Sequence, residues 1–178
     1  MKLRSVIKKT LLLLLVFAFA NIFADVASSK EIYNVYALEE EFFDTEVIHS
    51  YPCYMPYGIS DEKKAEILFK TLFNDPHNVI NYIPKDTKLL GISLNNDELI
   101  INASAEIKNY GGSFYERKLV RQILYTAFEL DSVNHVTLLI EGKTDYLPQG
   151  SLIEKISREE MRKDYTDEGV IICNEEQK

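Results

Sequence analysis

The sequence has few of the residues from which metal sites and nucleophilic active sites are built. Its 178 residues include three histidines and two cysteines. His49, His77 and His135 are far apart, and no His-Glu-x-x-His, calcium-loop or Gly-x-Ser-x-Gly pattern occurs. Glycine-rich phosphate-binding motifs are also missing. We therefore expect a protein that is not an enzyme, with no catalytic residue, no metal and no cofactor.

The two cysteines, Cys53 and Cys173, are separated by 119 residues. In an exported chain they could form a disulfide, and so long a loop would constrain the unfolded state by several kcal/mol in the chain-entropy model. The alternative is two unpaired thiols in a protein with a sufficient core. The sequence leaves both open.

The charge is predominantly acidic, with 20 Lys and Arg against 28 Asp and Glu and a net charge of -8. The first 20 residues contain four basic and no acidic residues, so the remainder carries a net charge of -12. A polyphosphate would be repelled by such a body, which argues against nucleic-acid binding. The apolar fraction of 46% excludes disorder throughout the chain.

Residues 1–24 have the pattern of a signal peptide or an N-terminal anchor. A basic start is followed by the apolar residues 11–20, and Ala18 and Ala20 suit a signal-peptidase site. A membrane span needs about 20 apolar residues, so a cleaved signal is favoured over a retained anchor, although both remain open. We expect an exported protein, secreted or membrane-associated at the cell envelope.

Several short elements are predicted for the first half of the exported part. Residues 32–37 and 46–49 are predicted strands, with an acidic turn at 39–41. Residues 51–58 hold two prolines and a glycine, which predicts an aromatic loop. That loop either folds over the edge of the core or forms an exposed partner-binding surface.

A helix is predicted to begin at Ser60, with Asp61 and Glu62 in its first turn. Its apolar stripe consists of Ala65, Leu68, Phe69, Leu72 and Phe73. A β-hairpin of residues 88–94 and 99–105 should follow, with a turn at 95–97. In its first strand Leu90, Ile92 and Leu94 are predicted to share one face.

A second helix is predicted after Gly111 and Gly112, with Ser113 and Glu116 forming a capping box. Two apolar stripes run along it: Leu119, Ile123, Ala127 and Leu130, and beside them Val120, Leu124 and Phe128. The second stripe either packs on the first helix or contacts a partner. Residues 136–140 form a last strand, and one or two helical turns follow residue 157.

This order predicts an α+β fold in which two helices cover one face of a small, mostly antiparallel sheet, whose other face is partly wet. Residues 31–152 would form the domain, and residues 153–178 a short helical extension and polar tail.

Residues 31–152 resemble the GerMN domain, the sporulation and spore germination module of Gram-positive bacteria. The resemblance rests on an ordered set: Ile83-Pro84, Thr87-Lys88-Leu89-Leu90, Gly111-Gly112, Gln122-Ile123-Leu124-Tyr125-Thr126, Val133, Val136, Glu141-Gly142-Lys143 and Ile156-Ser157-Arg158-Glu159. It implies a β-α-β-β-α-β module similar to ring-building motifs, with a non-catalytic, extracytoplasmic role in protein assembly. The chain departs from many members in having one copy of the module and no lipidation cysteine.

The sequence therefore predicts an exported protein-interaction or assembly module of sporulation or germination. Envelope or sporulation-complex proteins, or a second copy, would be its partners, and contact with a membrane would come only through an uncleaved N-terminal segment. A module that binds cell-wall glycan or a small ligand is the alternative, and a hydrolase is less favoured. A cleft joining His49 or His135 to two carboxylates would support a hydrolase. No binding residue is assigned.

Overall fold

The computed structural model describes residues 30–38, 47–74, 81–164 and 171–174. No helix in these ranges is long and apolar enough to span a membrane. The elements are β1 (Lys30–Leu38), β2 (Val47–Pro56), α2 (Asp61–Phe73), β3 (Leu89–Asn95), β4 (Glu98–Ala103), a 3-10 helix (Ala105–Lys108), α3 (Ser113–Ala127), β5 (His135–Ile140), β6 (Lys143–Thr144), β7 (Ile156–Ser157), α4 (Arg158–Asp164) and β8 (Ile171–Asn174).

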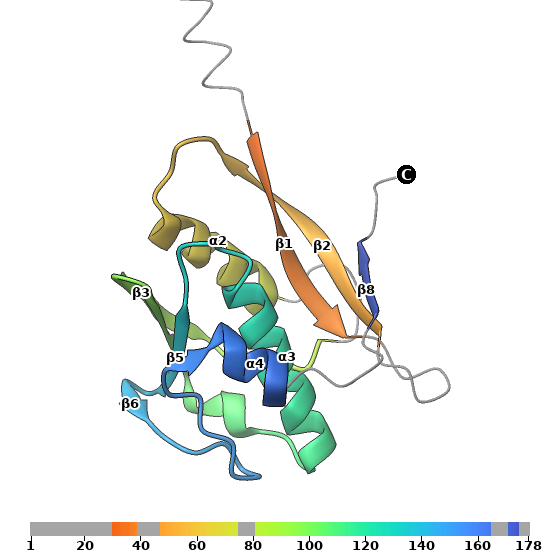
Figure 1. The fold of residues 1–178 in the computed structure, drawn as a ribbon. Coiled ribbons are helices and arrows are strands. Elements are labelled where there is room, and N and C mark those ends of the chain that lie inside the picture. Colours follow the sequence, from red (N-terminus) through yellow and green to blue (C-terminus); the bar gives the residue numbers. More distant parts are fainter. Residues whose placement is uncertain (1–29, 39–46, 75–80, 165–170, 175–178) are drawn as a thin grey trace, which may run out of the picture.

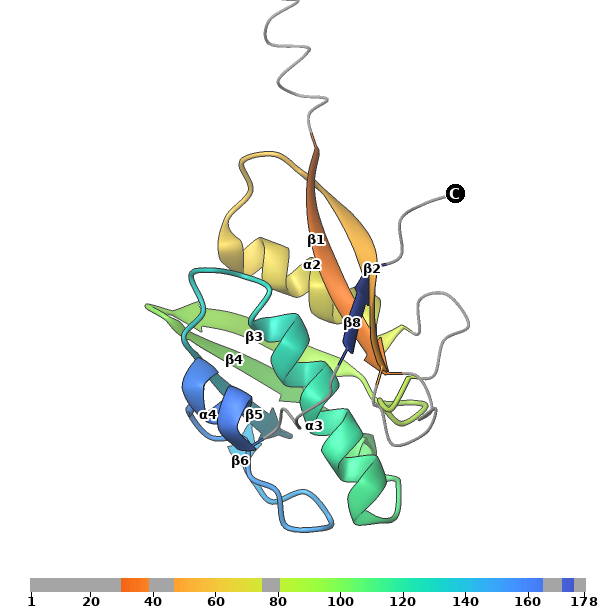
Figure 2. The ribbon, with the colours of Figure 1, turned by 45° about the vertical axis from the view of Figure 1, so that its right-hand side comes forward.

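The strands form two sheets with α2 and α3 between them (Figures 1 and 2). One sheet has the order β3-β4-β5-β6, and β7 also pairs with β5; the other has the order β1-β2-β8. The α+β class and the β-α-β-β-α-β order predicted from the sequence are confirmed. The difference is that β1 pairs with β2, and β2 with β8, in a separate sheet instead of joining the larger one.

The edge of β1 that does not pair with β2 lies against α3, and no strand of the described residues joins it there. The backbone N–H of Asn34 donates to the Glu129 carboxylate at 2.8 Å, and that of Tyr36 donates to Thr126 Oγ1 at 3.2 Å. The Gln122 amide donates to the Tyr36 carbonyl at 3.3 Å. Gln122 and Thr126 of α3, and Glu129 just after its end, take the hydrogen bonds that a neighbouring strand would otherwise make.

The prediction of a loop at residues 51–58 is wrong, because residues 51–56 belong to β2. Pro52 lies opposite Asn34 and Pro56 opposite Lys30. Since the Asn34 N–H points to α3, these pairs are not hydrogen-bonded across the sheet, and proline at such positions removes no ladder bond to β1. The alternate residues of this stretch are buried: Tyr51, Cys53 and Met55.

The helix α2 is as predicted. Ser60 is its N-cap, with the side-chain oxygen accepting from the Lys63 N–H at 3.3 Å, and Asp61 and Glu62 occupy the first turn. Four residues of its apolar stripe are buried and Phe73 packs against the same core. Lys64 is buried as well, among acidic partners described below.

The β3–β4 hairpin is confirmed, but Leu90 does not share a face with Ile92 and Leu94. A bulge between Leu89 and Gly91 shifts the register, so that Leu89 lies opposite Ala103. Leu89, Ile92 and Leu94 pack against the core, whereas the Leu90 side chain is 46% exposed. Sequence alternation cannot reveal a bulge, because one inserted residue reverses the faces of all residues before it.

The capping box predicted at the start of α3 is wrong. The N-cap is Gly112, at φ 93°, and no side chain caps the helix there. Gly112 is required because that backbone conformation disfavours side chains. Both apolar stripes of α3 are buried, so neither is open to a partner.

The register of the smaller sheet keeps the two cysteines apart. Cys173 in β8 lies beside His49, four residues from Cys53 along β2, which corresponds to roughly 13 Å. A disulfide needs Cα atoms within about 7 Å. Cys53 is a free, buried thiol, with its sulfur 3.8 Å from Thr71 Oγ1. Strand β8 itself was not predicted from the sequence.

Candidate interaction surfaces

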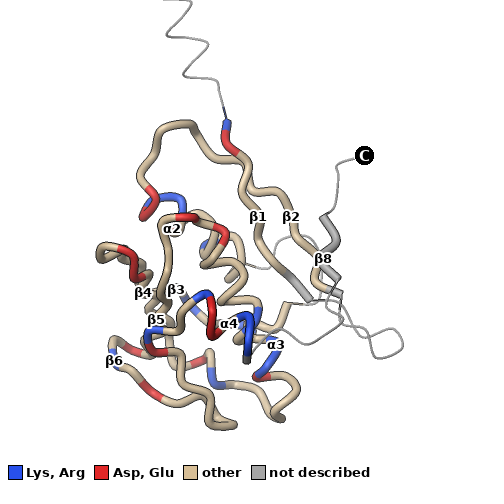
Figure 3. Tube along the Cα trace, viewed as in Figure 1, with Lys and Arg blue, Asp and Glu red and all other residues tan. Residues whose placement is uncertain are grey.

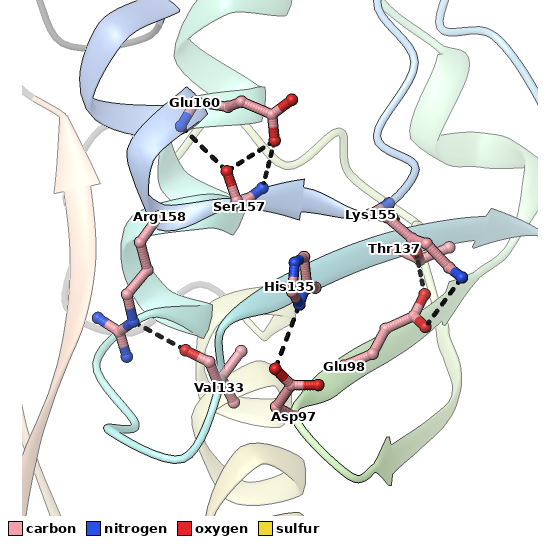
Figure 4. A network of polar contacts seen from close by, with 9 residues as sticks. All are labelled: Asp97, Glu98, Val133, His135, Thr137, Lys155, Ser157, Arg158 and Glu160. Atoms are coloured by element: carbon pink, nitrogen blue, oxygen red, sulfur yellow. Dashed lines mark hydrogen bonds and ion pairs between the residues drawn. The ribbon is translucent and has the colours of Figure 1, made fainter.

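The residues considered for catalysis do not converge in the described part of the chain. His135 Nδ1 lies 3.3 Å from one carboxylate, that of Asp97, at the β3–β4 turn (Figure 4). His49 lies in β2 and His77 lies outside the described residues. Among the described residues, no group of three or more His, Cys, Asp and Glu side chains could hold a metal ion.

Two shallow hollows, of about 340 and 460 Å³, are lined by neither His49 nor His135. The smaller is lined by Ile67, Lys70, Thr71 and Asn74 of α2 and its C-cap. The larger lies between the end of α2 and residues 81–88. Among the described residues, neither hollow therefore joins His49 or His135 to two carboxylates, as the predicted alternative of a hydrolase would require.

The C-terminal segment is fastened to the end of α3 by Arg158 (Figure 4). Its guanidinium group donates to the carbonyls of Phe128, Leu130 and Val133 at 2.8, 2.5 and 2.8 Å, and lies 5.0 Å from the centroid of the Phe128 ring. These carbonyls follow the last turn of α3, where the helix dipole favours a cation. Arg158 is therefore a structural clamp.

A capping box does occur in this protein, at the start of α4 (Figure 4). The Ser157 N–H and hydroxyl donate to the Glu160 carboxylate at 2.8 and 2.7 Å, and the Glu160 N–H donates to the Ser157 hydroxyl at 3.2 Å. The bond from the Ser157 backbone is the main reason that the pKa of Glu160 is lowered. The predicted helical turns after residue 157 are confirmed.

Aromatic rings gather at the start of α3. The rings of Tyr110 and Tyr115 are stacked with centroids 4.9 Å apart, and Tyr82 meets Tyr115 edge-on at 5.0 Å. Phe114 is 46% exposed, and Tyr146, in the loop after β6, is 61% exposed. We call Tyr110, Phe114, Tyr115 and Tyr146 the aromatic surface.

Glu116 holds the loop that carries Tyr146 against this helix. Glu116 is only 1% exposed. Its carboxylate accepts hydrogen bonds from the Tyr110 hydroxyl at 2.7 Å and from the backbone N–H groups of Gln149 and Ser151 at 2.6 and 2.8 Å. Burial alone would raise the pKa of Glu116, but these hydrogen bonds lower it below the ordinary value. The aromatic surface is thus built on a rigid support.

A second group of exposed apolar side chains lies where β1 begins and β2 ends. Ile32 and Tyr54 are directly opposite each other in the register and are 59% and 43% exposed. Tyr57, the first residue after β2, is 62% exposed. The Lys30 ammonium lies 6.0 Å from the Tyr54 ring centroid. We call Lys30, Ile32, Tyr54 and Tyr57 the Tyr57 patch.

The charges beside the Tyr57 patch are paired. Lys64 lies 2.8 Å from the Glu31 carboxylate and 3.3 Å from that of Asp61, and it donates to the Tyr33 hydroxyl at 2.7 Å. The hydrogen bond with Glu31 is the main reason that the pKa of Lys64 is raised. This group joins α2 to β1 and leaves little net charge at that end of the molecule.

A family model described as sporulation and spore germination matches residues 34–146. This chain belongs to that sporulation and spore germination family. The resemblance stated from the sequence is therefore confirmed. The matched region ends before Arg158 and the capping box of α4, and includes Gln122 and Thr126, whose side chains dock β1.

The fold is shared with solved structures of the same kind. The tandem GerMN domains of the sporulation protein GerM from Bacillus subtilis match with a TM-score of 0.59 and 18% identity, over 74% of this chain and 46% of that one. The first GerMN domain of GerM alone matches with a TM-score of 0.50 and 19% identity, over 74% of this chain and 99% of that domain. A Clostridium perfringens protein classed as a lipoprotein matches with a TM-score of 0.51 and 20% identity, over 74% of this chain and 89% of that one. No curated protein matches the chain.

Sequence reasoning did not find either exposed surface as such. The aromatic content of residues 51–57 indicated a partner-binding surface as one alternative, and Tyr54 and Tyr57 are indeed exposed while Tyr51 is buried. Successive side chains of β2 point to opposite faces, which buries Tyr51 and exposes Tyr54. This difference is visible only once the stretch is known to be a strand. Phe114 and Tyr115, which follow Gly111-Gly112, were a sequence signal for the aromatic surface. The contact that brings the loop to Glu116 could not be seen, because Gln149 and Ser151 lie 33 and 35 positions after Glu116 in the sequence.

Proposed function

We propose that this protein is an exported, non-catalytic interaction module that works at the cell envelope in sporulation or spore germination. Its family membership supports the process. The likeness to GerM and to the clostridial protein classed as a lipoprotein supports an extracytoplasmic location.

The observation that carries the proposal is the aromatic surface. Interface cores are enriched in aromatic residues, and energetically dominant contacts favour rigid, pre-organised side chains. Phe114 and Tyr146 are exposed. Glu116 holds the loop that carries Tyr146 against α3, the helix that carries Phe114. We assign this surface to an envelope protein of the same process.

The test replaces Phe114 with photoreactive benzoylphenylalanine in sporulating cells. Leu90 is the matched control position, because both side chains are 46% exposed. We expect a covalent adduct of one defined mass from the Phe114 position, lost when Tyr146→Ser is added, and no such adduct from the Leu90 position. The proposal is contradicted if the two positions give the same products, or if Tyr146→Ser leaves the adduct unchanged.

A glycan-binding module is the second candidate, because exposed aromatic rings can stack on sugar rings and Tyr146 is 61% exposed. Sedimentation with purified peptidoglycan separates the two. Retention that falls with Tyr146→Ser, together with no protein adduct at Phe114, would favour the glycan.

A further inference from the structure

The Tyr57 patch lies at the point where the chain enters the described fold. β1 begins at Lys30, and the Ile32–Tyr54 pair follows two residues later. The start of β1 and the end of β2 reach past α2, at the opposite end of the molecule from β6 and the start of α3 (Figures 1 and 2). The patch and the aromatic surface therefore lie at opposite ends of the molecule.

The sequence just before Lys30 has the chemistry of a membrane segment. Residues 11–20 are all apolar and are preceded by four basic residues, an arrangement that places the start of the chain in the cytoplasm. Nine residues separate Ala20 from Lys30, and the Cα atoms of these two residues can be at most about 36 Å apart when the chain between them is extended. If residues 11–20 stay in the membrane, the Tyr57 patch is held close to the outer surface of that membrane.

The electrostatics at this end allow such an approach, although the exported body is strongly acidic. The carboxylates of Glu31 and Asp61 are paired with Lys64, and Glu62 accepts a hydrogen bond from the Leu94 N–H at 3.0 Å. Basic residues stand beside acidic ones at the start of β1 and of α2 (Figure 3). An anionic lipid surface would therefore not repel this end as it would repel the molecule's overall charge.

We propose that the Tyr57 patch rests on the outer surface of the membrane that holds residues 11–20. This inference rests on the exported location in the proposed function and on an N-terminal segment that stays attached. Tyrosine rings favour the membrane interface, Ile32 supplies apolar contact, and Lys30 can pair with lipid phosphate. An apolar run much shorter than a full span gains from a second contact, because stable attachment takes two signals.

The experiment uses the full chain, which contains no tryptophan. Tyr57→Trp places one fluorescent reporter in the patch, and Tyr146→Trp is the matched control, since the two tyrosines are 62% and 61% exposed. Each variant is reconstituted into vesicles of phosphatidylcholine and phosphatidylglycerol, with and without bromine on the acyl chains. In parallel, the mass of the unmodified protein from cell envelopes is measured.

We expect blue-shifted emission and strong loss of emission with brominated lipid for Tyr57→Trp, little change for Tyr146→Trp, and a mass that retains residues 11–20. Equal quenching of both reporters, no quenching of either, or a mass lacking those residues overturns the proposal. A blue shift that depends on protein concentration and not on bromine would assign the patch to a second copy, and also overturns it. The cross-link at Phe114 is independent, so a failure here leaves the proposed function standing.

Discussion

Replacing Glu116 with glutamine tests how the aromatic surface is held. One carboxylate oxygen accepts from Tyr110 and Gln149, and the other accepts from Ser151. Glutamine has almost the same shape but only one acceptor oxygen, so its NH₂ group must face at least one of these partly buried donors. An unsatisfied buried donor costs about 1–3 kcal/mol, and the remaining bonds lose their charge assistance, so for partly buried donors we expect a loss of about 2 kcal/mol.

The free energy of unfolding is measured by urea titration at neutral pH and at pH 3, with Glu159→Gln, at an exposed position of α4, as the control. The pKa of Glu116 is lowered below its ordinary value of 4.5 in the folded state. Its stabilising contribution is therefore fully present above that value and is lost as the pH falls through the folded-state pKa. The difference in the free energy of unfolding between wild type and Glu116→Gln should become smaller at pH 3. If this difference is absent at neutral pH, or is the same at pH 3, the reasoning is refuted.

Three further stability changes follow from the contacts, each measured by urea unfolding. Arg158→Lys keeps the charge but cannot reach three carbonyls at once, so we expect a loss of about 2 kcal/mol; full stability would contradict the clamp. Ser157→Ala should cost about 1 kcal/mol as a lost helix cap, whereas Ser113→Ala should cost almost nothing; equal effects would contradict the cap assignment. Ile92→Ser should destabilise by more than 1 kcal/mol and Leu90→Ser, at a position 46% exposed, by less than Ile92→Ser; the reverse order would exclude the bulge.

The elements with strong local signals could be predicted from the sequence. Ser60 and the acidic first turn mark the start of α2, and the turn residues Asn96 and Asp97 mark the β3–β4 hairpin. The two apolar stripes predict a helix with a wide apolar face, with the second stripe left to the first helix or to a partner, and the residues of both stripes are buried. These signals depend on neighbours within a few residues, so they are visible without a fold.

What the sequence could not give depends on contacts between distant segments. Prolines argue against a strand in general, but Pro52 and Pro56 lie where β2 makes no hydrogen bond to β1, and this follows only from the register. Ser113 and Glu116 have capping-box spacing, yet Glu116 turns to a loop more than 30 residues away. Ser157 and Glu160 have the same spacing and do form a capping box. The motif therefore predicts a capping box only when no stronger partner competes for the carboxylate.

The two exposed surfaces are connected through α3. Its first turn supports the aromatic surface through Glu116, and farther along it Gln122 and Thr126 hold the edge of β1; Glu129, two residues after the helix ends, does the same. A helix of 15 residues is roughly 22 Å long and stiff, so its two sets of contacts cannot shift independently. Because β1 carries Ile32 of the Tyr57 patch, α3 fixes the separation of the two surfaces. On the two proposals above, a module of this construction would hold its partner at a set distance from the membrane that the Tyr57 patch contacts, and it would need no moving part to do so.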